Sequence, residues 1–590
     1  MKRNILSFIL LLLAISAQAQ KQRFFNLTVE DVTIDSLLPH FTYAIPIGEN
    51  YADSTYQLEI RYPEFLDMSA ADISRYNKLS GMPLSSLPNI QQQMVVERKK
   101  GILEFSLVPI VERNGKKQFL VSFMIALTSK PRNARQVRAN RISTTGNTQL
   151  YANHSVLSSG KWAKIRVPAN GIYNLTTDVI RRAGFSDLSK VRIYGYGGNL
   201  QDERISSAYL KEFDDLKEVP SCFVGGKRLF YGRGPVSWDS NTATIRTRNH
   251  YSNYGYYFIT ESAEAPLTVD ANTFLTSVYP TADDYHSLHE IENYSWFPGG
   301  RRFFENTPIA VGKTQTYTLT NTAKASNGTL AIGVSAGKGR TSIQIEVNGE
   351  KKGELSMSTG EFDYGAEIER KYPLVGLHDV DSIKITTLSG GPARLDYVSI
   401  TYDKPRSAPN LTEGTFPVPE YVYNITNQDL HSHTPVDLVI IIPTSQKLLK
   451  QAQRLAAFHE QHDGIKVRIV PADEIFNEFS SGTPDAMAYR RYMKMLYDRA
   501  KTEAEIPKSL LLFGDCVWDN RMITPECRLL NTDDYLLAYE SDNSFSLTDC
   551  YINDGWYTLM DEGEGVNQTN IDKEDIGVGR FPVSTTDEEQ

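Results

Sequence analysis

The sequence predicts a multidomain protein in which β-rich modules, one of them a β-sandwich, precede an incomplete α/β domain with a parallel sheet. A chain of 590 residues is too long for a single hydrophobic core and implies several domains. Strand patterns separated by turn signals dominate up to about residue 404. From about residue 435 onward, apolar runs alternate with helical patterns, which is typical of a parallel sheet flanked by helices.

The composition is that of a globular protein. Hydrophobic residues make up 41% and charged residues 23% of the chain. The net charge of −9 is spread along the sequence and argues against a nucleic-acid partner. The 32 tyrosines favour β-rich extracellular modules.

The N-terminus has the pattern of a signal peptide, predicted over residues 1–19. Lys2 and Arg3 precede an apolar run from Ile5 to Ile15, and Ala17-Gln18-Ala19 provides a small-x-small cleavage site. The apolar run is short for a membrane span, so an uncleaved anchor is the less favoured alternative. The mature protein is therefore expected to be exported, and to be soluble or held at a surface by partners.

Domain boundaries follow the composition. A β domain is predicted at 20–135, where Asn114-Gly115 indicates a hairpin turn. Residues 136–155 form a polar, basic stretch, which is interpreted as a solvated linker or, alternatively, as a docking patch. The other predicted segments are an irregular β-rich domain at 156–306, a β-sandwich at 307–404, a linker at 405–434 and the α/β domain at 435–590.

One strand of the irregular domain is unusually aromatic. Residues Tyr251 to Thr260 contain several tyrosines. Aromatic pairs across neighbouring strands generally stabilise sheets, so packing is the favoured interpretation. An aromatic platform that binds sugar is the alternative.

The α/β domain opens with a strand from Leu438 to Ile442, an unbroken apolar run typical of burial on both faces. Ser445 is expected to cap a helix that ends at Gly464. A second strand follows at Ile465–Val470. A helix opens at Thr483-Pro484-Asp485, with Thr483 as its expected cap and one face that includes Ala488 and Tyr492, and a third strand covers Leu510–Phe513. Asp515 follows that strand and lies at the carboxyl edge, where α/β sheets bind ligands.

The four cysteines are too few for a disulfide-stabilised scaffold; they are Cys222, Cys516, Cys527 and Cys550. A Cys516–Cys527 or a Cys527–Cys550 bridge is compatible with the sequence, which does not choose between them. Cys516 also follows the tip of a predicted strand and is a fallback candidate for a nucleophile. A structural or disulfide-bonded role is the favoured interpretation.

Two pairs of histidines are candidate partners for such a cysteine or for a metal. His431 and His433 alternate in the predicted linker and lack a further zinc-ligand set, although either is a possible neighbour of Cys516. His459 and His462 fall near a helix end, where histidine interacts favourably with the helix dipole.

Several motifs in the α/β domain resemble the gingipain-type cysteine peptidases of family C25, which have a gingipain/caspase-like fold. The matching pieces are Asp437-Leu438-Val439-Ile440-Ile441-Ile442-Pro443, Leu511-Leu512-Phe513-Gly514-Asp515 and Gly577-Val578-Gly579-Arg580-Phe581-Pro582. Upstream motifs narrow the resemblance to the sortases of the type IX secretion system, among them Ser159-Gly160-Lys161-Trp162 and Ile193-Tyr194-Gly195-Tyr196-Gly197-Gly198.

The resemblance implies a cysteine peptidase and transpeptidase of the outer membrane or cell surface. Such an enzyme removes the C-terminal signal domain of cargo proteins and attaches the new carboxyl terminus to lipopolysaccharide, through a Cys nucleophile and a His base. Its partners are cargo proteins, outer-membrane secretion proteins and the lipopolysaccharide acceptor. In the family both catalytic residues follow the Gly-Arg-Phe-Pro strand, so they are expected beyond Gln590 and the chain is interpreted as a fragment.

The resemblance also implies a calcium site that includes Asp515 and Asp575. The simpler interpretation gives these carboxylates turn and capping roles. The acidic turn Asp561-Glu562-Gly563-Glu564-Gly565 is expected to be solvated.

Two further functions remain open. One is a non-enzymatic surface scaffold or secretion component with a peptidase-like domain, and the other is a secreted protease that digests external protein. A His and a Cys at the tips of later strands would favour an enzyme.

Overall fold

The computed structural model describes residues 21–27, 33–34, 38–80, 83–132, 150–337, 339–568 and 571–585. The chain forms two compact units, each of which is described by itself. The N-terminal unit consists of Met1–Thr145 and Asp561–Asp575, and the main unit of Gly146–Met560 and Ile576–Gln590. The predicted signal peptide and most of the predicted linker at 136–155 lie outside the described residues.

The N-terminal unit is built from two antiparallel sheets, as the strand patterns predict. One sheet contains β1 (Lys21–Asn26), β8 (Lys116–Pro131), β4 (Ser54–Asp67) and β7 (Ile110–Arg113). The other contains β2 (Thr33–Ile34), β3 (Pro39–Gly48), β6 (Lys100–Leu107) and β5 (Gln91–Glu97), and the helix is α2 (Ala70–Leu79). Asn114 and Gly115 have positive φ angles of 50° and 75°, which confirms the predicted hairpin turn between β7 and β8.

The irregular β-rich module of the main unit is organised around one antiparallel sheet, which includes a strand from the predicted linker. Its order is β11 (Val191–Tyr194), β16 (Gly255–Glu261), β9 (Trp162–Val167) and β25 (Glu420–Ile425). Smaller sheets contain β10 (Gly171–Asn174), β13 (Lys227–Gly232), β12 (Ser221–Val224), β14 (Val236–Ser237) and β15 (Thr247–Arg248). The helices are α4 (Thr177–Arg182), α5 (Ser207–Glu212) and α6 (Ala271–Val278).

The β-sandwich has two four-stranded antiparallel sheets that enclose one apolar core. The first contains β17 (His286–Glu290), β24 (Ala393–Tyr402), β19 (Asn327–Gly337) and β22 (Gly365–Val375). The second contains β18 (Thr314–Thr320), β23 (Val380–Ser389), β20 (Arg340–Val347) and β21 (Glu350–Ser358). The sandwich therefore starts about twenty residues earlier than the predicted boundary at 307, because β17 pairs with β24.

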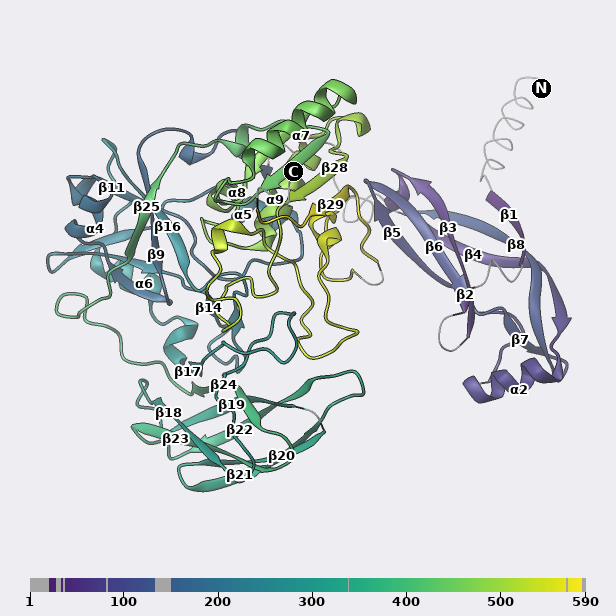
Figure 1. Cartoon of the computed structure of the whole chain (residues 1–590), viewed down its shortest axis with the longest axis horizontal. Helices are drawn as coiled ribbons and strands as arrows, with labels where there is room; N and C mark the ends of the chain where they lie inside the picture. The colour runs from purple at the N-terminus through teal and green to yellow at the C-terminus, as the bar shows by residue number, and fades with distance from the viewer. Residues whose placement is uncertain are drawn as a thin grey trace, which may run out of the picture. The chain divides into compact units, whose positions relative to one another are not determined.

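The α/β part has the parallel sheet that the alternating pattern predicts, with the order β27 (Val467–Pro471), β26 (Leu438–Ile442), β28 (Ser509–Phe513) and β29 (Gly577–Phe581). Its helices are α7 (Leu449–His462), α8 (Ala472–Phe479) and α9 (Ala486–Arg499). Figure 1 shows this sheet and its helices in the green-to-yellow part of the chain. Alternate residues of β26 face opposite ways: Leu438 and Ile440 pack in the cluster that holds α7, and Val439 packs in the cluster that holds α8 and α9.

Two predicted helix caps were wrong. Helix α7 begins after Leu448 without a side-chain cap, and the Ser445 amide instead donates to the Asp533 carbonyl. Helix α9 is capped by Asp485, whose carboxylate accepts from the Met487 amide at 2.9 Å. Thr483, the expected cap, donates to the Gly197 carbonyl of the β module. For Thr483 a tertiary contact takes the hydroxyl that the local pattern assigned to the helix.

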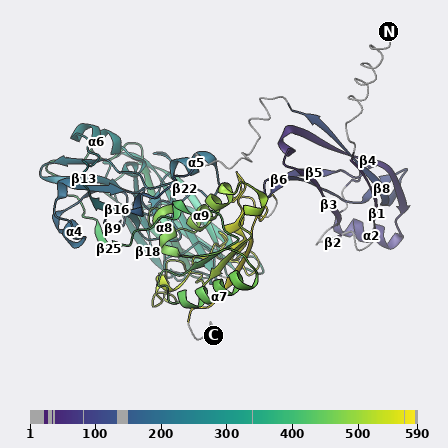
Figure 2. The ribbon, with the colours of Figure 1, turned by 90° about the horizontal axis from the view of Figure 1, so that it is seen from above.

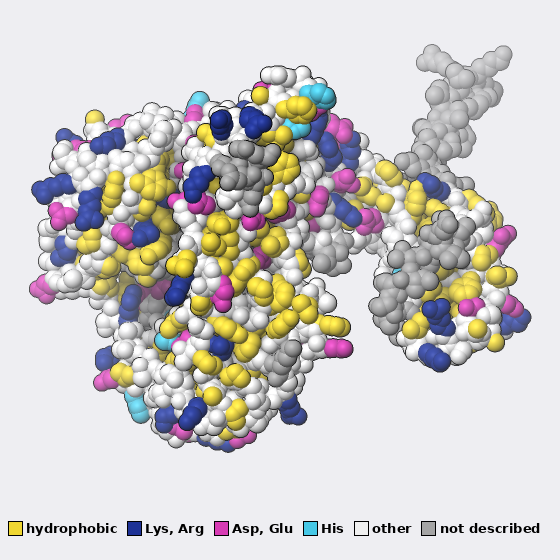
Figure 3. All heavy atoms as spheres, in the orientation of Figure 1, with side chains coloured by type: hydrophobic (Ala, Val, Ile, Leu, Met, Phe, Trp, Pro, Cys, Tyr) yellow, Lys and Arg dark blue, Asp and Glu magenta, His cyan; other side chains and the backbone are white. Residues whose placement is uncertain are grey.

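Among the described residues, no helix has both the length and the apolar character that a bilayer crossing requires. On the face that Figure 3 shows, basic and acidic side chains are interspersed.

Candidate functional site

The predicted site lies at the carboxyl edge of the parallel sheet, where Asp515 and Cys516 follow β28. The Asp515 carboxylate accepts a hydrogen bond from the Cys516 amide at 2.8 Å, which is a local turn contact. The Cys516 thiol is half-buried, and burial raises its pKa, although the nearby Arg580 partly opposes this. Nucleophilic cysteines have lowered pKa values, because the thiolate is the reactive form. The raised pKa disfavours the reactive thiolate, so we assign Cys516 a structural role.

Arg580 ties β29 to the loops at this edge, and sequence reasoning did not identify it as a site residue. Its guanidinium forms an ion pair with Asp554 at 2.7 Å and donates to the Leu537 carbonyl at 3.1 Å. The sequence shows Arg580 as part of the Gly-Arg-Phe-Pro motif. Its partner Asp554 lies in the short 3₁₀ helix η10 (Asp554–Thr558), and no sequence pattern indicates that the two residues pair.

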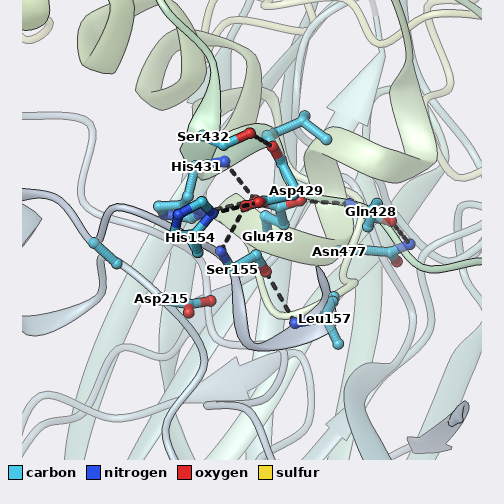
Figure 4. A network of polar contacts seen from close by, with 12 residues as sticks. His154, Ser155, Leu157, Asp215, Gln428, Asp429, His431, Ser432, Asn477 and Glu478 are labelled. Atoms are coloured by element: carbon cyan, nitrogen blue, oxygen red, sulfur yellow. Dashed lines mark hydrogen bonds and ion pairs between the residues drawn. The ribbon is translucent and has the colours of Figure 1, made fainter. Parts of the chain in front are cut away.

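His431 occupies a buried polar network that holds the linker before β26 in place (Figure 4). Its Nδ1 lies 2.6 Å from Glu478 Oε2, and its Nε2 lies 3.1 Å from the Asp214 carbonyl oxygen. Burial alone would lower the pKa of His431, but its hydrogen bonds to Asp214 and Glu478 outweigh burial and raise it to about 10. Glu478 also accepts from the amides of Leu430 and His431 at 2.8 and 3.0 Å.

The other candidate histidines also have partners. His433 Nδ1 lies 3.0 Å from the Tyr492 hydroxyl, and burial lowers the pKa of His433 to about 4. His459 and His462 both contact Asp463, at 2.6 and 2.7 Å, at the C-terminal end of α7. The four histidines considered from the sequence are thus each held by an oxygen rather than by the Cys516 sulfur.

The four cysteines all lie in the described part of the chain, and all are free thiols. The disulfide pairings that the sequence left open do not form in the structure.

The two aspartates predicted to share a calcium ion lie at opposite ends of neighbouring strands. Strands β28 and β29 are parallel, with Ser509 opposite Gly577 and Phe513 opposite Phe581. Asp515 follows the carboxyl end of β28, whereas Asp575 precedes the amino end of β29. With ~3.3 Å per residue along a strand, the two positions are separated by roughly the length of the strand pair.

Asp575 instead belongs to a buried acidic group in the N-terminal unit. One carboxylate oxygen of each of Asp561, Glu564 and Asp575 lies within 4.8 Å of the others, and all three residues are buried. Burial, followed by the charges of Asp575 and Asp561, raises the pKa of Glu564 to about 9. The expectation of a solvated acidic turn at 561–565 was therefore wrong for Asp561 and Glu564. The three-residue spacing of Asp561 and Glu564 can be read from the sequence, but the distant residues that bury these two side chains cannot.

This donor set fits a hard cation. Calcium takes six to eight oxygen ligands, and three carboxylates supply several of them. Some of these oxygens already accept backbone hydrogen bonds, from the Lys99 amide to Asp561 at 3.4 Å and from the Lys573 amide to Glu564 at 3.2 Å.

Comparison with known proteins gives two informative matches. Residues 431–590 match the model of peptidase family C25. The chain is also similar to latent dimeric PorU from Porphyromonas gingivalis, with 28% sequence identity and a TM-score of 0.60. That similarity covers 75% of this chain and 49% of the PorU chain, so this chain spans about half the length of the solved relative.

A family 35 carbohydrate-binding module from an environmental isolate is 20% identical, and the match covers 21% of this chain and 91% of the module. Its TM-score of 0.16 is too low to support an inference. No curated protein sequence matches the chain. The chain is therefore similar to PorU over three quarters of its length, and its residues 431–590 match the peptidase family C25 model.

Proposed function

We propose that the protein carrying this chain is the sortase of a type IX secretion system, a cysteine endopeptidase and transpeptidase. It removes the C-terminal signal domain of cargo proteins and joins the new carboxyl terminus to surface lipopolysaccharide. The observation that carries the proposal is the similarity to PorU over 75% of the chain. The family C25 match covers less than a third of the chain, so the similarity extends into the β modules.

The proposed chemistry proceeds through a thioester. A cysteine thiolate attacks the carbonyl at the cleavage point, and the bond to the signal domain breaks as that segment leaves with its new amino terminus. A nucleophile on the acceptor then attacks the thioester, and the thiolate is released. Cys516 is not proposed as the nucleophile, because burial raises its pKa and the histidines described above contact oxygen atoms.

The proposal includes location and partners. The protein is exported through the N-terminal signal and acts at the outer membrane or cell surface. It meets cargo proteins, outer-membrane secretion proteins and the lipopolysaccharide acceptor there. Calcium is proposed as a structural ion held by Asp561, Glu564 and Asp575, with no part in the chemistry.

The test uses the longest reading frame that contains this chain. The purified protein is incubated with a cargo protein that bears a C-terminal signal domain, with and without glycinamide as a simple amine acceptor. Mass spectrometry then identifies the new carboxyl terminus. A sortase leaves an amide adduct in the presence of the amine, because the amine intercepts the thioester.

The outcomes separate the candidate functions. If cleavage yields only a free carboxylate product at every amine concentration, the protein is a peptidase and the proposed transpeptidase activity is ruled out. No cleavage of any cargo by correctly folded protein would favour the scaffold alternative.

A further inference from the structure

A cavity of about 450 Å³ lies at the carboxyl edge of the parallel sheet, within the main unit. Thr444 after β26 and Val517 after β28 line it. Strand β26 is followed in sequence by β27 on one side, and β28 is followed by β29 on the other side. Adjacent strands whose connections run in opposite directions form the crevice in which α/β proteins bind ligands. The cavity volume falls within the range typical of small-ligand sites.

One wall of the cavity is a face of the antiparallel sheet of β16, β9 and β25, which lies beside α8 in both ribbon views (Figures 1 and 2). Lys164 of β9 stands opposite Phe258 and Tyr423, and Arg166 stands opposite Tyr256. The alternate residues, such as Ile165, face the apolar core on the other side. Two cations and several aromatic rings thus share one face of this sheet, and the side chains of Lys164, Arg166, Tyr254, Tyr256 and Tyr423 line the cavity.

Lys164 is an unusual residue for a wall of this kind because it is 5% exposed. Its Nζ lies 4.5 Å from the centre of the Tyr256 ring and 5.7 Å from that of Tyr423. It donates to Asn477 Oδ1 at 3.3 Å, a long hydrogen bond. Burial lowers the pKa of Lys164 to about 8. An ammonium with three donors therefore has capacity for an additional acceptor.

Two carboxylates also line the cavity, Asp473 at the start of α8 and Asp533 in the 3₁₀ helix η9 (Thr532–Asp534). Burial raises the pKa of both, and the charge of Lys164 partly opposes this. The described ion pairs include none between Lys164 and either carboxylate, although both carboxylates act electrostatically on Lys164. The buried Oδ1 of Asp473 has no hydrogen-bond partner among the described residues. A buried acceptor of this kind is costly unless a ligand or water satisfies it.

The required ligand must offer both donors and acceptors, and it must have apolar faces. A multiply charged anion would be repelled by Asp473 and Asp533. A cation would compete with Lys164 for these two carboxylates. A purely apolar ligand would leave the ammonium and the carboxylates unsatisfied. A sugar ring fits, because its hydroxyl groups donate to carboxylates and accept from an ammonium, while its C–H faces pack on tyrosine rings.

We propose that this cavity binds a short neutral oligosaccharide, with Asp473 and Lys164 as its polar anchors and Tyr254 and Tyr256 as its packing surface. The proposal stands on the cavity and does not depend on peptidase activity. A zwitterionic peptide could pair with the same charges, but it has no need of a tyrosine-lined wall.

The test measures binding by the purified chain, without any cleavage assay. Neutral trisaccharides of glucose, galactose, mannose and N-acetylglucosamine are titrated by calorimetry, and triglycine is the competing zwitterionic probe. We expect at least one trisaccharide to bind and Asp473→Asn to weaken that binding at least tenfold. Asp283→Asn is the control, because this half-buried carboxylate bonds Asn170 and Tyr231 outside the cavity.

Tyr256→Ala provides a second variant if Asp473→Asn does not fold, as judged by circular dichroism. It is expected to weaken binding by a similar factor, since the ring forms part of the packing wall. Binding of triglycine in place of the sugars would overturn the proposal. So would failure of all four sugars to bind the folded wild type, or equal binding by the wild type and both cavity variants.

Discussion

His431 shows how a residue that resembles a catalytic candidate in sequence becomes a structural one in three dimensions. Its alternation with His433 left a zinc pair as a minor alternative without further ligands, and nothing nearby indicated Glu478 or Asp214, which lie 47 and 217 positions away. Cys516 is the complementary case. Its position at a strand tip was predicted correctly from the apolar run, but its raised pKa depends on burial by segments that the sequence does not connect to it.

The His431 network predicts a pH-dependent stability. The pKa of His431 is about 10 in the folded chain and 6.5 as the reference value, so the folded state binds its proton more tightly. This contribution is complete below pH 6.5 and is lost as the pH rises toward 10, with a slope of up to about 1.4 kcal/mol per pH unit. Urea unfolding of the wild type between pH 6 and 10 measures it.

The variant His431→Gln should remove that slope and lower the free energy of unfolding at pH 6 by about 3 kcal/mol, because Glu478 then stays buried without its charged partner. His459→Gln, near the C-terminal end of α7, is the control and should retain the slope that His431 contributes. An unchanged profile in His431→Gln would show that the imidazole is not held as a cation.

At the scale of elements, the buried strands were the most predictable features, because β26 and β28 are continuous apolar runs that have no other stable environment. Helix α9 was predicted as amphipathic, yet its residues from Ala486 to Asp498 are all buried. The helix packs against both the sheet and the β module, and its arginines bond to carbonyl groups. Only the tertiary partners of α9 show that its polar face is also covered. Helix α8 was not predicted from the sequence, because it follows β27 directly.

Arg490 allows a test of this packing. Its Nε donates to the Leu559 carbonyl at 2.8 Å and its terminal nitrogen to the Glu203 carbonyl at 2.6 Å. Arg490→Met keeps most of the apolar stem and leaves those two carbonyls without these donors, which should cost about 3 kcal/mol. Arg454→Met on the exposed side of α7 should change stability by less than about 0.5 kcal/mol. Equal effects in chemical denaturation would contradict the burial assigned to α9.

At the scale of the whole molecule, the order of modules followed from composition, whereas the assignment of segments to modules did not. The predicted linker at 405–434 provides β25, because an extended segment can complete a sheet whose other strands lie far earlier in the chain. Residues 561–575 likewise belong to the N-terminal unit although they interrupt the α/β segment. The module to which such a segment belongs depends on long-range pairing, for which a single sequence carries no local signal.

The acidic group in that unit predicts a response to calcium. Adding calcium to metal-free protein should raise the melting temperature of the chain, because an ion that binds only the folded state stabilises it. Glu564→Gln should reduce this shift strongly, whereas Glu562→Gln, which changes an exposed neighbour, should not. A shift that is absent in the wild type, or that is equal in all three proteins, would rule out the proposed ion site.

The most direct test of the central claim compares cargo cleavage by the wild type and by Cys516→Ala, using the longest reading frame that contains this chain. If residues 431–590 are the supporting part of a C25 peptidase whose nucleophile lies elsewhere, both proteins cleave the cargo at the same rate. Iodoacetamide should block both. Loss of cleavage in Cys516→Ala, with a correctly folded protein, would contradict the account.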